Sequence, residues 1–470
     1  MSFFSGLVKR RWLFIGLFVG SALLIGPIPE GLTPFGMRGL ALVVVAFIFF
    51  MTEPIPLPAV ALFIAVAQVL LGIERPTGVA QSFMSDSVFF IMGSLMIATA
   101  IVKQNLDKRI ALAIVRLTGP RVDRIVLGLI SVSAFIASFI GEHTVGAMML
   151  PVGVALIKFT SDDRKKIRNL STIIMLSIAY GSMIAAIGTP SGGARNAIML
   201  AYWKELFGVN MTYFGWMKAA YPIILLQIPF VAFFLYRAFA PEVKDLSPAI
   251  AALRAQVAEG GGMTRQDWTV VGIFLFTVLM WMTISDRIGL GITALIGVLL
   301  FFVAGVVRWE DLNNNVNWGI ILIYGGAISL GIAMKQTGVA EWIALSFLKW
   351  MEPLGIHRGL PLLAAISLMT LLLASFMGSG ATVGILGPIT LNIASLSHTS
   401  ILEAGFITVI SSSFVYLTSV ASPACNIIYG SGYVRRSDFL KAGWKLVLVS
   451  FVLIILTAAG YWRALGLSDV

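Results

Sequence analysis

Residues 137–151 read ASFIGEHTVGAMMLP, and residues 374–388 read ASFMGSGATVGILGP. The two stretches align without a gap, because their first alanines and their last prolines are both 237 residues apart (374 − 137 and 388 − 151). Each stretch is apolar except for a glycine-containing centre. Such a break at membrane depth is tolerated only where it is buried in protein or lines a wet cavity. The pattern predicts one re-entrant helical hairpin in each half of the chain.

Other segments recur in the same order. Each hairpin is followed by an apolar helix that breaks at a proline, Pro190 in the first half and Pro423 in the second. An upstream block also recurs, with Gly93 and Lys103-Gln104 matched by Gly325 and Lys335-Gln336. We count five spans and a hairpin in each half after a lone first helix, and an odd number of spans inverts the second copy. Inverted repeats with broken helices are typical of secondary transporters that bind substrate between the copies.

The composition excludes a soluble protein. Of the 470 residues, 58% are hydrophobic and only 12% are charged, against about 25% in soluble domains. The net charge of +11 comes from basic residues in short loops, where they act as topology signals, so we expect no nucleic-acid partner. One cysteine and three scattered histidines exclude a disulfide framework and disfavour a metal centre. No nucleophile with a base is evident, so we expect neither an enzyme nor an organic cofactor.

We therefore expect an all-α polytopic membrane protein with about eleven transmembrane helices and two re-entrant hairpins. The first transmembrane helix is expected in 1–36, repeat 1 with an inner hairpin in 37–240, a cytoplasmic linker in 241–266, and repeat 2 with an outer hairpin in 267–470. The basic loops place the N-terminus in the cytoplasm and the C-terminus outside. We expect the lipid surroundings to be the cytoplasmic membrane.

The hairpin tips and the broken turns are the candidate binding elements. Glycines let backbone amides face a ligand, and helices that begin at such points present positive dipole ends, which together favour an anion. A carboxylate in a membrane protein marks a functional site by default, and Glu142 lies at the first tip. The candidate substrate-binding residues are Glu142, His143, Thr144, Thr189, Pro190, Arg195, Ser379, Gly380, Thr382, Ser422 and Pro423.

Nearly the whole chain resembles the divalent anion:sodium symporter (DASS) family, most clearly in AMMLP at 147–151 and NIIYGSGY at 426–433. The resemblance implies transport of dicarboxylates, citrate or sulfate, coupling to Na⁺, an elevator movement of a transport subdomain against a scaffold, and a homodimer. In the family each tip carries Ser-Asn-Thr, whereas 141–143 read GEH and 378–380 read GSG here. The positions that the resemblance assigns to Na⁺ are Ala137, Gly141, Glu142, Gly188, Ala374, Met377, Ser379 and Ala421.

Several alternatives stay open at this point. Glu142 has three candidate partners: Na⁺, a proton, or Arg195. Arg195 either faces the substrate anion, forms a permanent pair with Glu142, or lies at a distant aqueous face. His143 is either a satisfied interior histidine or a titrating group. The corresponding functions are a Na⁺-coupled anion symporter, a sodium-independent exchanger or proton-coupled anion transporter, and a Na⁺/H⁺ antiporter.

Overall fold

The computed structural model describes residues 3–104, 118–161, 163, 165–251, 262–419 and 422–469. Every named element in these ranges is a helix, and the described residues contain only one isolated β-bridge, between Arg121 and Asp245. Ten of the described helices are long and apolar enough to cross a membrane. The predicted all-α polytopic membrane fold is therefore confirmed.

The first half contains these elements: α1 (Phe3–Ile25), α2 (Pro34–Thr52), α3 (Leu57–Leu70), α4 (Pro76–Phe83), α5 (Asp86–Lys103), α7 (Val122–Ile140), α8 (Glu142–Thr160), α9 (Arg168–Ala185), the 3₁₀ turn η1 (Pro190–Gly192), α10 (Ala194–Phe207) and α11 (Tyr213–Ala238). The second half contains α13 (Arg265–Thr283), α14 (Ser285–Ile288), α15 (Leu290–Val303), α16 (Trp309–Asn315), α17 (Trp318–Gln336), α18 (Val339–Met351), α19 (Gly359–Met377), α20 (Ser379–Leu396), α21 (Ile401–Ser413), α22 (Pro423–Gly430) and α23 (Arg436–Leu456). Helix α23 continues into a π-helical turn at Thr457–Trp462.

Local sequence explains where several helices begin. The Thr33 side chain accepts a hydrogen bond from the backbone N–H of Gly36, and Pro34 occupies the first turn of α2, where its missing N–H costs nothing. Thr264 and Asp267 form a reciprocal capping box at the start of α13. The linker residue Glu242 accepts hydrogen bonds from the backbone N–H groups of Asn169 and Leu170, so it satisfies the first turn of α9.

Both predicted hairpins are present. Helices α7 and α8 pack against each other and join at Gly141, and α19 and α20 do the same at Gly378. Both glycines have a positive φ, +87° and +76°, which a residue with a Cβ adopts only at a cost. The chain can therefore end one apolar helix and begin the next within a single residue, and it does so at equivalent positions of the two halves.

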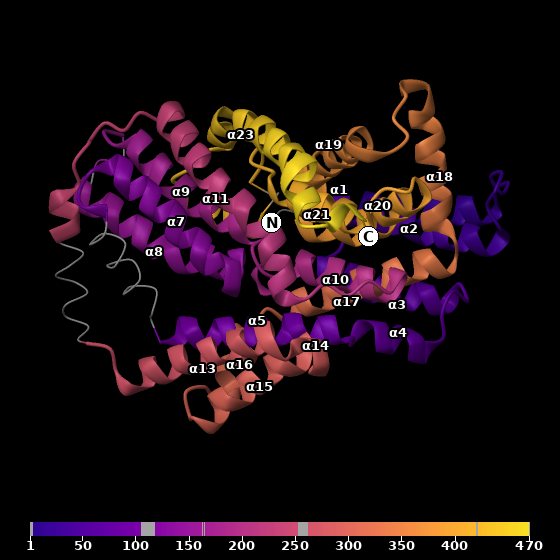
Figure 1. The fold of residues 1–470 in the computed structure, drawn as a ribbon, viewed down its shortest axis with the longest axis horizontal. Helices are drawn as coiled ribbons and strands as arrows, with labels where there is room; N and C mark the ends of the chain where they lie inside the picture. The colour runs from indigo at the N-terminus through magenta and orange to yellow at the C-terminus, as the bar shows by residue number, and fades with distance from the viewer. Residues whose placement is uncertain are drawn as a thin grey trace.

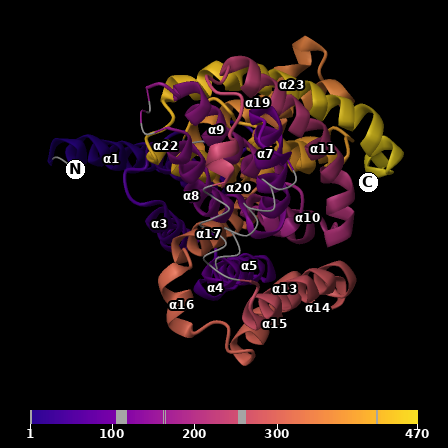
Figure 2. The ribbon, with the colours of Figure 1, turned by 90° about the vertical axis from the view of Figure 1, so that its left-hand side faces the viewer.

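Helices of each half also pack against helices of the other half. Helix α5 packs against α15 of the second half, and α17 packs against α3 of the first. Likewise, α8 packs against α22, and α20 packs against α10. Figures 1 and 2 show α5 together with α13, α14 and α15 on one side of the molecule, and the α7–α8 hairpin with α9 and α11 on another. The hairpin tips consequently lie where the halves meet.

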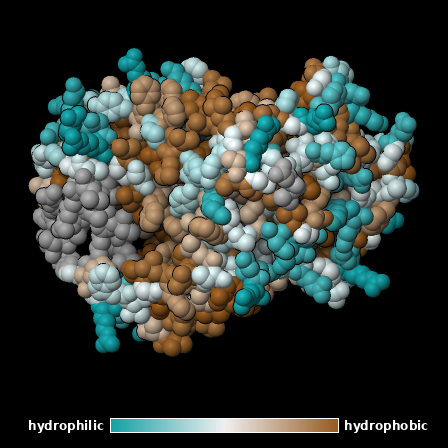
Figure 3. All heavy atoms as spheres, viewed as in Figure 1, coloured by the Kyte–Doolittle hydropathy of each residue, from teal (hydrophilic) through white to brown (hydrophobic). Residues whose placement is uncertain are grey.

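Large apolar side chains cover much of the outer surface. Phe18 on α1, Leu70 on α3 and Val303 on α15 are 73%, 80% and 85% exposed. On the face in Figure 3, hydrophobic residues spread across the central region between groups of hydrophilic residues. A soluble protein would not present so much contiguous apolar surface, so lipid covers these helices.

Candidate functional site

A cavity of about 430 Å³ lies where the two halves meet. The first hairpin tip lines it through Gly141, Glu142, His143 and Thr144, and the second through residues 378–381. Both broken turns reach it as well, the first through residues 190–195 and the second through Ser422 and Pro423. One cavity thus collects all four repeated elements, as the sequence repeat predicts.

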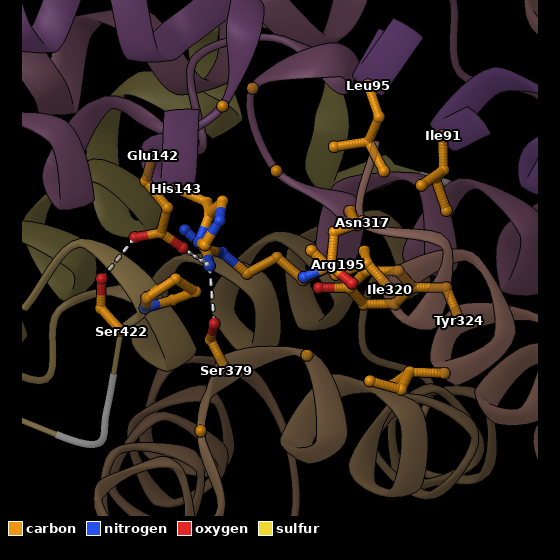
Figure 4. Close-up of a pocket in the computed structure, with 18 of the residues that line it drawn as sticks. Ile91, Leu95, Glu142, His143, Arg195, Asn317, Ile320, Tyr324, Ser379 and Ser422 are labelled. Carbon is orange, nitrogen blue, oxygen red and sulfur yellow. Dashed lines mark hydrogen bonds and ion pairs between the residues drawn. The ribbon is translucent and has the colours of Figure 1, made fainter. Parts of the chain in front are cut away.

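A network of buried polar groups connects these elements (Figure 4). Nη1 of Arg195 donates to Oε1 of Glu142 at 2.7 Å and to Oγ of Ser379 at 2.6 Å. The other carboxylate oxygen of Glu142 accepts a hydrogen bond from Oγ of Ser422 at 2.6 Å. The residues of the ion pair are 3% and 6% exposed. The first hairpin and first break are thereby joined to the second hairpin and second break.

The backbone around the first break positions Arg195. This residue lies in the first turn of α10, directly after η1 and the extended residue Gly193. The side-chain amide of its neighbour Asn196 donates to the carbonyl oxygens of Ala186 and Thr189, both at 2.7 Å. Asn196 therefore holds the unwound segment 186–193 closed, and the Arg195 side chain leaves α10 toward the hairpin tips.

The guanidinium keeps unused donors. Its Nε and Nη2 atoms are buried and have no hydrogen-bond partner among the described residues. Buried donors without partners are costly, and in native proteins such groups have a reason, for example an ordered water or ion or a functional role. A carboxylate, sulfate or sulfonate group accepts from two guanidinium N–H groups at once. Arg195 is accordingly suited to hold one anionic group.

Most of the other candidate substrate residues line the cavity, but two of them do not. His143, Thr144, Pro190, Gly380, Ser422 and Pro423 line the cavity together with Glu142, Arg195 and Ser379. Thr189 does not line it, because its hydroxyl donates to the carbonyl of Ser138. Thr382 bonds instead to the carbonyl of Gly378. These two threonines brace the break and the tip.

Of the candidate sodium residues of the first half, Ala137 has its carbonyl oxygen close to Gly192. A Cβ on Gly192 would lie 2.5 Å from the carbonyl oxygen of Ser138, 2.7 Å from that of Ala186 and 3.0 Å from that of Ala137. Three carbonyl oxygens therefore lie close to one glycine between the first hairpin and the first break, and they already accept hydrogen bonds from the Thr189 hydroxyl, the Asn196 amide and the Gly141 N–H, respectively. Oxygen ligands of this kind suit Na⁺ at unwound helix segments. Gly141 lines the adjacent cavity, and Gly188 packs against the Ser138 hydroxyl.

The second half is built differently. The carbonyl of Ala374 accepts the backbone N–H of Gly378, and the hydroxyl of Thr418 donates to the carbonyl of Ser375 at 3.3 Å. Met377 lines the cavity. Ala421 lies outside the described residues. Among the residues that the structure describes, no group of three or more His, Cys, Asp or Glu side chains comes together.

Sequence reasoning missed the opposite wall of the cavity. That wall comes from α5 and α17, with Ile91 and Leu95 on the former and Ile320 and Tyr324 on the latter. The Tyr324 ring occupies the space beside Gly380, because a Cβ there would lie 2.8 Å from it. The recurring block at Gly93 and Gly325 pointed to these helices, but the pattern alone did not say that they approach the hairpins.

Comparison with known proteins agrees with this architecture. Residues 8–468 match the family described as the sodium:sulfate symporter transmembrane region. The chain belongs to this family. The match spans both hairpins and both breaks, which confirms the DASS resemblance drawn from the motifs.

Individual relatives and solved structures extend the comparison. The sodium-dependent dicarboxylate transporter SdcS of Staphylococcus saprophyticus is 25% identical, over 97% of this chain and 93% of that protein. An uncharacterised transporter of Haemophilus influenzae is 27% identical, over 91% and 92%. Among solved structures, the YdaH transporter of Alcanivorax borkumensis aligns with a TM-score of 0.54 and 11% identity, covering 83% of this chain and 89% of that one. MtrF of Neisseria gonorrhoeae aligns with a TM-score of 0.51 and 10% identity, covering 83% of each chain. The two structures show a shared fold.

Proposed function

We propose that this DASS-family protein is a secondary active transporter of small anions that is coupled to Na⁺. The observation that carries the proposal is the buried guanidinium of Arg195, which contacts both Glu142 at the first hairpin tip and Ser379 at the second. A cation held between two repeated hairpins is placed to bind an anion at the interface of the repeats. The sodium-dependent dicarboxylate transporters among the relatives support the same class of substrate and ion.

Arg195 is the anchor for the substrate in this proposal. Its free Nε–H and Nη2–H groups take the anionic group, which belongs to a di- or tricarboxylate or a sulfate-like anion. His143, Thr144 and Ser422 line the same cavity and supply further polar contacts. The Glu142 carboxylate holds the guanidinium in place from the opposite side.

Na⁺ binds, in this proposal, among the carbonyl oxygens that converge on Gly192 in the first half. The equivalent region of the second half offers Ser379 and the carbonyl groups near Ala374 and Met377, but the Ser379 hydroxyl is already bonded to Arg195. The two sodium sites are unequal in this proposal, with the first binding more tightly, because only the first tip adds a carboxylate, that of Glu142.

The packing of each hairpin against a broken helix of the other half, α8 against α22 and α20 against α10, supports an elevator movement. In this proposal the hairpins and broken helices move as one unit against a scaffold of the remaining helices, among them α5 and α17, which form the opposite wall of the cavity. The unit boundaries are those of the sequence: a first span in 1–36, repeats in 37–240 and 267–470, and a cytoplasmic linker in 241–266. The repeats are inverted in the cytoplasmic membrane, with the N-terminus inside and the C-terminus outside. The family resemblance adds a homodimer, which the mass of the protein in detergent tests.

One observation favours a second candidate. At the first tip, where the resembled family carries Ser-Asn-Thr, this chain has the titratable carboxylate of Glu142, and the fixed cation of Arg195 pairs with it. A fixed cation cannot be carried across, so it favours sodium-independent anion exchange, or coupling to a proton on Glu142.

Counterflow in proteoliposomes separates the two candidates. Vesicles loaded with an unlabelled anion are diluted into the labelled anion, with and without a Na⁺ gradient, over a panel of dicarboxylates, sulfate and monocarboxylates. Symport predicts uptake that requires external Na⁺. Uptake that is unchanged when choline replaces Na⁺ would establish the exchanger or proton-coupled alternative, and uptake of no anion would contradict both.

A further inference from the structure

Another pocket, of about 400 Å³, lies between the end of α11 and the beginning of α23. Phe234 and Arg237 line it from α11, and Lys441, Trp444 and Lys445 line it from α23. We propose that this pocket binds the headgroup of an anionic phospholipid from the surrounding membrane. The site is separate from the transport cavity, because the two pockets share no lining residue among those described.

The pocket is positively charged. Its described lining holds three cationic side chains, Arg237, Lys441 and Lys445, and no carboxylate. None of the three forms an ion pair with a described residue. All three are exposed, so their charge is accessible to a ligand. Like charges that share one pocket repel each other, and an anion bound between them offsets this repulsion.

The nearest carboxylates in the sequence are engaged elsewhere. Asp438 lies one turn before Lys441 in α23. It pairs with Arg168 at 3.4 Å and accepts a hydrogen bond from the backbone N–H of Arg435 at 2.9 Å. Glu242, which follows α11, accepts from the backbone N–H groups in the first turn of α9. The described part of the fold therefore supplies no counter-charge to the pocket, and an anionic ligand would complete it.

The donors suit a phosphate group. The Arg237 guanidinium can present two N–H groups to two phosphate oxygens at once, and a lysine ammonium binds phosphate as a point charge. The Lys441 ammonium lies 4.8 Å from the centre of the Phe239 ring, and that of Lys445 lies 5.3 Å from the centre of the Trp444 ring. Such cation–π contacts favour positions of the ammonium groups close to the helices rather than out in water.

The surroundings favour a lipid over a soluble anion. Helices α11 and α23 pack against each other, and both are long and apolar enough to cross a membrane. Phe233 lies one turn before Arg237, and Leu448 lies one turn after Trp444, so apolar side chains continue the same helix faces. They are 61% and 56% exposed and can contact acyl chains. Basic pockets between transmembrane helices are typical sites for anionic lipid headgroups.

The test uses the full-length protein, purified and delipidated in an uncharged detergent, and follows its thermal midpoint during titration. The ligands are phosphatidylglycerol, phosphatidylcholine of the same chain length, and glycerol phosphate as the soluble headgroup. We expect saturable stabilisation by phosphatidylglycerol at a concentration at least tenfold lower than by phosphatidylcholine. Equal stabilisation by the two lipids would overturn the proposal. Stabilisation by glycerol phosphate that is lost in variants of the pocket would identify a soluble anion as the ligand, and would overturn it as well.

Three substitutions locate the effect in the pocket. Arg237→Gln, Lys441→Gln and Lys445→Gln should each weaken the binding of phosphatidylglycerol about fivefold, the contribution of one cation near a membrane surface. The triple variant should weaken it about 100-fold. The single variants keep the test decisive if the triple variant does not fold. Unchanged affinity in all three single variants would contradict the assignment of this pocket.

A second triple variant is the control for net charge. Lys158→Gln, Lys204→Gln and Lys349→Gln together remove the same charge from exposed positions that line neither pocket. Binding of phosphatidylglycerol to this variant should match that of the parent. Equal weakening in the two triple variants would show a general attraction of anionic lipid to a basic protein, and would overturn the proposed site.

Discussion

Arg195 and Ser379 are 184 residues apart in sequence, yet Nη1 of the arginine donates to the serine hydroxyl at 2.6 Å. The contact joins the break of one repeat to the hairpin tip of the other. It also places the cation between segments of different halves of the chain. Variants of Arg195 should therefore change both transport and stability, and a second substitution at its partner Glu142 is needed to tell the two effects apart.

Replacement of Arg195 should affect transport and stability separately. Arg195→Lys keeps the charge but loses the planar pair of N–H groups, so we expect about 10- to 100-fold weaker anion binding, and Arg195→Ala should nearly abolish uptake. Arg195→Ala also leaves Glu142 buried and unpaired, which costs about 3–5 kcal/mol of stability. The measurements are counterflow and the thermal midpoint.

The double variant Arg195→Ala/Glu142→Gln separates these effects. Removal of both charges should restore the thermal midpoint without restoring uptake. If Arg195→Ala alone transports as well as the parent, the pair serves only to hold the hairpin to the helix, and Arg195 is not a substrate residue.

The dependence of uptake on Na⁺ concentration should show that the two proposed sodium sites differ in affinity. Because only the first hairpin tip carries a carboxylate, that of Glu142, and the Ser379 hydroxyl at the second tip is bonded to Arg195, we expect a Na⁺ titration without sharp cooperativity. Initial rates in proteoliposomes at fixed anion concentration give the measurement. A steeply cooperative curve would favour the intact two-sodium mechanism of the family. If uptake is independent of Na⁺, Glu142→Gln should instead change its pH dependence.

Gly192→Ala should destabilise the first break and impair Na⁺ binding. The new methyl group would meet the carbonyl oxygens of Ser138 and Ala186 at 2.5 and 2.7 Å, and both are backbone atoms that cannot turn aside. We expect overpacking to lower stability by about 1–3 kcal/mol and to abolish any stabilisation by Na⁺, measured by thermal unfolding with and without the ion. Gly272→Ala in α13 is the control, because nothing lies within 4 Å of its new methyl group. Equal responses to Na⁺ in the two variants would argue against a site at Gly192.

The ion pair between Lys103 and Asp311 should make the thermal stability of the protein depend on pH. The Lys103 ammonium, followed by the backbone N–H of Arg308, lowers the pKa of the Asp311 carboxyl. A lowered folded-state pKa gives stability above the unfolded value of about 3.9, and this contribution is lost as the pH falls through the folded pKa. The thermal midpoint of Asp311→Asn should therefore lie below that of the parent at neutral pH, and the two should converge below about pH 4.

Glu310→Gln supplies the comparison for this variant. Glu310 is the neighbouring exposed carboxylate on α16 and has no ion-pair partner among the residues that the structure describes. Its midpoint should follow that of the parent at every pH. A difference between parent and Asp311→Asn that does not change with pH would show that the aspartate acts through capping geometry alone.

Much of the fold could be predicted from local pattern. The ungapped offset of 237 residues located both hairpins and their turning points at Gly141 and Gly378, because a glycine break in an apolar run has few structural solutions in a membrane. Prolines 190 and 423 located the breaks for the same reason. The choice among partners of Glu142 stayed open, since sequence does not give the direction in which a side chain leaves a helix.

The sequence by itself determined the membrane fold, the repeated hairpins and the set of polar residues near their tips, because hydropathy and glycine placement act locally. Only the tertiary structure decided that Arg195 pairs with Glu142 while contacting Ser379, and that Thr189 and Thr382 turn away from the cavity. It alone brought Leu95 and Tyr324 opposite the tips. These arrangements depend on the packing of helices from different halves, such as α10 against α20, and such long-range contacts leave no mark in a local pattern.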